Sequence, residues 1–133
     1  WLGTPFCHQG RLIGVGVDCV GLVIGVARSL GLSDFDVTGY ARRPDSDMLE
    51  TQARELMQPI PIAAARPGDV LLIAIDGRAQ HLAIRSELAG DPAMIHAYAP
   101  MRRVVEHRID AGWAARIRAA FRLPGVVAEE EAD

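Results

Sequence analysis

Apolar residues form one helical run near the start of the chain and several short runs after it. The helical run, CVGLVIGVARSL at 19–30, is apolar on almost every side, with Asp18 at the N-cap position before it and Gly31 at the C-cap position after it. A helix that is apolar all round is typical of the middle of a domain. Gly21 and Gly25 lie four apart on one of its faces, so we expect that face to pack closely against a sheet.

The segments on either side are polar or rich in turn residues. Residues 3–16 contain four glycines and a proline and predict a surface loop that leads to the helix. Residues 33–47 predict a polar loop. A second, peripheral helix is predicted after Asp47, which stands three residues before Glu50 as in a capping box, and its apolar stripe is formed by Leu49, Ala53 and Leu56.

The second half of the chain predicts a β-sheet. The apolar run Val70–Ile75 is followed by Asp76-Gly77, a dipeptide that favours a hairpin turn. Further strands are predicted at 80–85, 94–98, around 103–107, and at 119–123. Because helices come first and antiparallel strands follow, the fold class is α+β, with a buried N-terminal helix packed on an antiparallel β-meander.

Composition is that of a single globular domain. The chain has 133 residues, of which 50% are hydrophobic and 23% charged, and its formal net charge is −3. We expect one domain over residues 1–125 and an acidic, disordered tail at 126–133, and the apolar start at Trp1-Leu2 suggests that a short helix precedes it. The mild acidity and the lack of basic runs argue against nucleic acid or a membrane as a partner.

Cys19 is the strongest candidate for a catalytic residue, because it is a thiol at the first turn of the buried helix. The positive end of the helix dipole is expected to lower the pKa of that thiol toward the nucleophilic thiolate. The alternative is a small core residue, since free cysteines are often buried, and position alone does not separate the two. A disulfide with Cys7 is a third alternative, in which Cys19 could not act as a nucleophile.

A nucleophilic thiol needs a base within hydrogen-bond reach and a group that orients the base. His81 and His96 fall on neighbouring predicted strands, where side chains that face each other lie about 4.5–5.5 Å apart, so their rings can touch. His8 precedes the helix and is expected to line a cleft, whereas His107 stands in a charged strand and is expected at the surface.

Cofactor sites are not indicated. The cysteines and histidines lack the Cys-x-x-Cys and closely spaced His pairs of zinc sites, and the glycines do not follow a phosphate-binding pattern. The sequence therefore predicts neither a metal nor another cofactor.

Five segments, taken in order, resemble the NlpC/P60 family of papain-like cysteine peptidases. They are GTPF at 3–6, GVDCVGLV at 16–23, PGDVL at 67–71, HLAI at 81–84 and IHA at 95–97. HQG at 8–10, Trp113 and the closing RAAFRLP at 118–124 most resemble the branch of tail-associated cell-wall peptidases of phages and gene transfer agents.

The resemblance implies a papain-like fold and a role for each site residue. Cys19 would be the nucleophile, His81 the base and His96 the residue that orients His81. Phe6 stands where many members have a tyrosine, and we expect it to bind substrate together with His8 and Asp18. The implied substrates are the stem peptides or cross-bridges of peptidoglycan, cut at amide bonds that often involve D-amino acids.

The resemblance also implies partners and a place of action. Tail-tip or baseplate proteins of a phage-like particle would carry the enzyme, made in the cytoplasm, in the virion tail to the cell wall in the periplasm. Two alternatives stay open: a structural tail-tip subunit with a weak or vestigial peptidase site, and an acyltransferase or amidase on the same scaffold.

Overall fold

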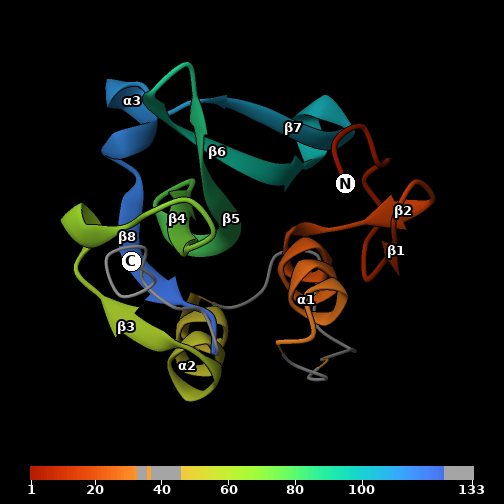
Figure 1. Ribbon diagram of the computed structural model, residues 1–133, viewed down its shortest axis with the longest axis horizontal. Coiled ribbons are helices and arrows are strands. Elements are labelled where there is room, and N and C mark those ends of the chain that lie inside the picture. Colours follow the sequence, from red (N-terminus) through yellow and green to blue (C-terminus); the bar gives the residue numbers. More distant parts are fainter. Residues whose placement is uncertain (33–35, 37–45, 125–133) are drawn as a thin grey trace.

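The structure, a computed structural model, describes residues 1–32, 36 and 46–124. Within these residues helices pack against a six-stranded antiparallel sheet in the order β3-β8-β4-β5-β6-β7 (Figure 1). The strands of this sheet are β3 (Gln58–Ile60), β4 (Val70–Ile75), β5 (Arg78–Leu88), β6 (Asp91–Tyr98), β7 (Arg103–Arg108) and β8 (Ile117–Arg122). The remaining elements are α1 (Cys19–Ser29), α2 (Ser46–Leu56), α3 (Ala111–Ala114), the 3₁₀ turns η1 (Ile62–Ala64) and η2 (Ala99–Met101), and a small hairpin of β1 (Arg11–Leu12) and β2 (Gly16–Val17).

The predicted α+β class is confirmed, and so is the meander from β4 to β7. Asp76 and Gly77 both have positive φ, 52° and 77°, as a two-residue hairpin turn requires. The last strand departs from the prediction: β8 does not extend the meander beyond β7 but returns to pair with β4. As a result, the apolar strand β4 has a neighbour at each edge.

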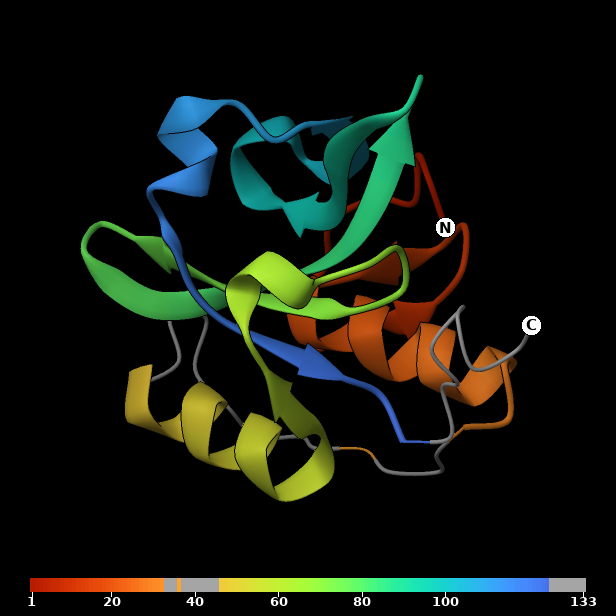
Figure 2. The ribbon, with the colours of Figure 1, turned by 60° about the vertical axis from the view of Figure 1, so that its left-hand side comes forward.

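Strand β4 is also buried on both faces, which explains its uninterrupted apolar sequence. Val70 and Leu72 belong to the core shared with α1 and α2, which lie on the same side of the sheet in Figure 2. Leu71 and Ile73 belong to a second core on the opposite face, against which Trp113 of α3 packs.

Helix α1 begins where the sequence predicts and ends one residue earlier, at Ser29, with Leu30 as its C-cap. The Asp18 side chain accepts the N–H of Gly21, and Gly31 adopts a left-handed φ of 71° just beyond the last turn. There the N–H of Gly31 donates to the carbonyl of Arg28, and the next N–H, that of Leu32, donates to Ala27. By contrast, α2 begins at Ser46, so Asp47 lies inside the first turn rather than before it.

The predicted surface loop at 3–16 is instead pinned to the sheet and contains the β1–β2 hairpin. The N–H of Gly3 donates to Val104 at 3.0 Å, that of Phe6 donates to Arg102 at 2.9 Å, and Thr4 accepts from Val104 at 2.9 Å. Since β7 is an edge strand, these bonds cover backbone groups that would otherwise be unpaired.

The two helix glycines do pack closely, but against the N-terminal segment and not against the sheet. A Cβ at Gly21 would collide with the carbonyl oxygen of Gly10, and one at Gly25 would lie 2.5 Å from two ring atoms of Trp1. The N-terminal segment can therefore lie against α1 only because these positions have no side chain.

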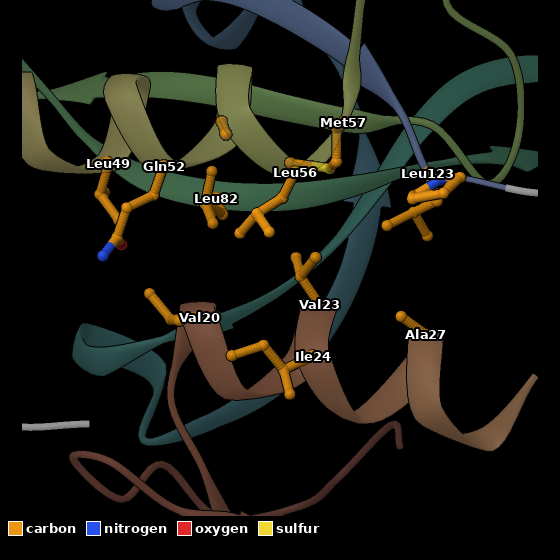
Figure 3. Close-up of a pocket in the computed structure, with 12 residues that line it drawn as sticks. Val20, Val23, Ile24, Ala27, Leu49, Gln52, Leu56, Met57, Leu82 and Leu123 are labelled. Atoms are coloured by element: carbon orange, nitrogen blue, oxygen red, sulfur yellow. The ribbon is translucent and has the colours of Figure 1, made fainter. Parts of the chain in front are cut away.

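An apolar space of about 70 Å³ remains between α1 and α2 (Figure 3). Val20, Val23 and Ile24 face Leu49 and Leu56 across it. None of the described residues that line it is ionisable, so it offers neither a nucleophile nor a base.

Most of the predicted loop at 33–47 and the predicted tail at 126–133 lie outside the described residues. Among the helices that are described, none has the length and apolar character needed to cross a membrane.

We predict opposite effects of Gly25→Ala in two backgrounds. With Trp1 present, the new methyl group meets the indole ring, and the free energy of unfolding should fall by about 1–3 kcal/mol. In a Trp1→Ala background the same change should instead stabilise the helix by up to about 1 kcal/mol, the difference in helix propensity. Urea unfolding of the four proteins measures both values, and equal effects in the two backgrounds would contradict the close packing.

Candidate active site

A second cleft, of about 450 Å³, opens where the start of α1 meets the β4–β5 turn and the end of β6. Five of the six residues singled out from the sequence line it: Phe6, His8, Asp18, Cys19 and His81. The sixth, His96, is fully buried and lies directly behind His81. Tertiary structure therefore brings all six to one place.

Asp18 organises the start of α1. One of its carboxylate oxygens accepts the N–H of Gly21 at 2.8 Å, and the other accepts the N–H of Gln9 at 2.8 Å. Nη1 of Arg11 and Nδ1 of His8 lie 3.4 Å and 3.8 Å from the same carboxylate. The side chain thus ties the N-terminal segment to the helix, while its role in substrate binding stays a prediction.

The thiol of Cys19 is half-buried at the wall of the cleft. Burial raises its pKa from 9.0 to about 12, and the negative charge of Asp18 acts in the same direction. Backbone N–H groups, first that of Leu82, oppose this rise without cancelling it. The expectation of a lowered pKa is therefore wrong, because the loss of hydration on burial outweighs the backbone N–H groups near the thiol.

A β-bulge positions His81 on β5. His81 pairs with Ile73 of β4 but Ala79 already pairs with Ala74, so Gln80 is an extra residue. The ladder between β5 and β6 begins only at the pair Ile84–Ile95, and His81 lies beyond it. The bulge and the end of the ladder fall where the cleft opens.

His81 belongs to a chain of three histidines. Nε2 of His81 lies 2.7 Å from Nδ1 of His96, and Nε2 of His96 lies 2.8 Å from Nε2 of His107. Nδ1 of His107 is 2.9 Å from the carbonyl oxygen of Arg108. The sequence predicts a surface position for His107, but the residue is half-buried and its ring reaches inward from β7 to His96.

Aromatic side chains pack against this chain. The ring of Tyr98 stacks on His96 at a centroid distance of 4.9 Å, and Trp113 meets His96 edge to face at 5.3 Å. Burial lowers the pKa of His81 to about 4; the pKa of His96 falls to about 3, first through burial and then through the neighbouring histidines. Both rings are consequently neutral at pH 7.

Two further cleft residues, Tyr98 and Gln80, were not singled out from the sequence. Tyr98 could have been found, because it stands two residues after His96 in a strand and so shares its face. Gln80 could not, since its place in the cleft depends on the bulge.

The described residues include no group of three acidic, cysteine or histidine side chains arranged to hold a metal ion. Cys7 and Cys19 are both free, so the structure excludes the disulfide alternative.

A thiol at the start of a buried helix that shares a cleft with a histidine on an antiparallel sheet is the arrangement of papain-like cysteine peptidases. A sequence model of the NlpC/P60 family matches residues 3–122, and the chain belongs to that family. Members of the family are cysteine peptidases, and so is this protein.

Comparison with solved structures agrees with this assignment. The chain is similar to the NlpC/p60 domain of the peptidoglycan hydrolase SagA, with a TM-score of 0.61 and 25% sequence identity over 92% of this chain and 89% of that one. The papain-like fold implied by the sequence is thereby confirmed. A comparison with curated protein sequences found no match.

We predict that acid destabilises the protein through the buried histidines. The pKa of His81 is about 4 in the folded state against 6.5 for a free histidine, so the unfolded chain binds more protons between these values. The free energy of unfolding should be highest above pH 6.5 and should fall as the pH drops toward 4, by up to about 1.4 kcal/mol per pH unit for each such ring. Urea unfolding across this range should show that the free energy of unfolding depends less steeply on pH in His81→Gln and His96→Gln. A pH dependence equal to that of the wild type would contradict the lowered pKa values of these histidines.

Proposed function

We propose that the protein hydrolyses amide bonds in the stem peptides or cross-bridges of peptidoglycan. The observation that carries the proposal is a cleft that holds both Cys19 and His81, with His96 in hydrogen-bond contact behind His81. The likeness to a domain of a peptidoglycan hydrolase supports the choice of substrate.

The geometry gives each residue a step in the reaction. His96 occupies Nε2 of His81, so Nδ1 of His81 is the nitrogen left to take the thiol proton. As the proton leaves, the sulfur of Cys19 attacks the substrate carbonyl, and backbone N–H groups at the start of α1 stabilise the oxyanion. His81 then protonates the departing amine, and water hydrolyses the acyl-enzyme with His81 as the base.

Burial decides when the charges form. With the pKa of Cys19 raised and that of His81 lowered, thiol and imidazole are both neutral in the substrate-free protein. The proton therefore moves during the attack, and the two charges appear together.

The cleft walls supply the binding surface. Phe6 and His8 line it from the N-terminal segment, and Tyr98 lines it from β6. Phe6 brings an aromatic face without a hydroxyl group, whereas Tyr98 adds a phenol to the described lining of the cleft. We propose that Phe6, His8 and Asp18 contact the peptide on the α1 side of the scissile bond.

We further propose that the protein acts as part of a phage-like tail and opens the wall locally during DNA delivery. The support is the resemblance of HQG at 8–10, Trp113 and residues 118–124 to tail-associated peptidases. Tail-tip or baseplate proteins would hold the enzyme against its large substrate, and tethering would raise its effective concentration there.

We predict that Cys19→Ala lowers hydrolysis of purified muropeptides by more than about a thousandfold, because no nucleophile remains. The matched control is Cys7→Ala, which removes the exposed cysteine and should keep full activity. Mass spectrometry should show products that have gained water, whereas joined peptides would indicate an acyltransferase. Equal activity of Cys19→Ala and wild type would refute the proposed mechanism.

The tail role has its own prediction. Particles that carry Cys19→Ala should assemble and contain the protein, yet deliver DNA poorly into cells with intact walls. Normal delivery by these particles, together with failed assembly when the gene is deleted, would show that the role is structural and that the proposed wall opening is wrong.

A further inference from the structure

We propose that His107 is a positioning residue that sets which ring nitrogens of His96 and His81 carry protons, and thereby leaves His81 able to accept the proton of Cys19. This role rests on the proposed function, because it concerns the same site. The inference comes from three consecutive hydrogen bonds, one of which ends on a backbone carbonyl.

The carbonyl oxygen of Arg108 sets the direction of the chain. A carbonyl only accepts, so Nδ1 of His107, 2.9 Å away, must carry a proton and donate it. In its neutral form His107 has one N–H, and its Nε2 is then a bare acceptor. That nitrogen lies 2.8 Å from Nε2 of His96, which must therefore be the donor.

The same reasoning continues to the cleft. With its proton on Nε2, His96 presents a bare Nδ1 to Nε2 of His81 at 2.7 Å, and His81 must donate there. Nδ1 of His81 is left without a proton, as a base requires. A reversal of the chain would place a proton on that nitrogen, and His81 could no longer receive one from the thiol.

The surroundings keep His96, the middle of the chain, away from water. His96 is 0% exposed and its ring packs against those of Tyr98 and Trp113, which also contact each other, so water does not reach it to replace a missing acceptor. Burial also lowers the pKa of both His81 and His96, which keeps each ring at one N–H and makes the choice of nitrogen matter. A packing role for His107 would need only its ring, which lies 5.2 Å from that of Trp113.

Two substitutions distinguish the role of His107 as a hydrogen-bond acceptor from its role as a packed ring. His107→Phe keeps an aromatic ring against His96 and Trp113 but has no acceptor, whereas His107→Gln loses the ring and keeps an acceptor oxygen at similar reach. We expect kcat to fall about 10- to 100-fold in the Phe variant with little change in KM, the size of effect that follows loss of an outer hydrogen-bond partner. The Gln variant should restore kcat close to that of wild type, and thermal unfolding checks that both proteins are folded.

Nitrogen-15 NMR of the histidine rings gives a readout that is independent of activity. At neutral pH the wild-type protein should carry protons on Nδ1 of His107 and on Nε2 of His96 and His81. The Phe variant should show a rise in the Nδ1–H form of His81, and the Gln variant should not.

Three results would overturn the proposal. The first is a proton on Nε2 of His107 in the wild type, and the second is an unchanged tautomer of His81 in the His107→Phe variant. The third is full activity of the His107→Phe variant together with loss of activity in the His107→Gln variant. If the wild-type protein does not cleave muropeptides, the proposed function fails while the NMR still decides the role of His107.

Discussion

The site depends first on one buried carboxylate. Asp18 is only 3% exposed, and its oxygens accept the N–H groups of Gly21 and Gln9, one in the helix and one in the N-terminal segment. These bonds offset the cost of burying a charge and satisfy a helix end that would otherwise fray. Cys19 is thereby held as the first residue of α1, and the segment that carries Phe6 and His8 is held beside it.

The sheet supplies the other half of the site and keeps it rigid. β4 has neighbours at both edges and cores on both faces, so β5 and its histidine pair with a strand that is packed on every side. Asp69 strengthens this support, because its carboxylate accepts from Nε and Nη2 of Arg122 at 3.1 Å and 3.0 Å and ties β8 to the start of β4. The PGDVL segment is therefore a structural part of the fold rather than a part of the cleft.

Burial shapes the chemistry as much as the identity of the residues does. The same exclusion of water raises the pKa of Cys19 and lowers that of His81, so neither group is charged before the reaction. The reactivity of a neutral thiol and imidazole depends on which nitrogen of the imidazole carries the proton. The hydrogen bond between His96 and His81 bears on that choice, and the His96 ring packs against Tyr98 and Trp113.

The sequence by itself determined what depends on near neighbours: α1 with its Asp18 cap and Gly31 end, the β4 run, and the Asp76-Gly77 turn. The order of its motifs also indicated the family and named Cys19, His81 and His96 as candidates. Only the tertiary structure decided that β8 returns to β4, that Gln80 is a bulge residue, and that His107 reaches His96, because strand register joins residues far apart in the chain. It alone decided that the pKa of Cys19 is raised, since a local helix dipole can be read from the sequence but the water lost on burial cannot.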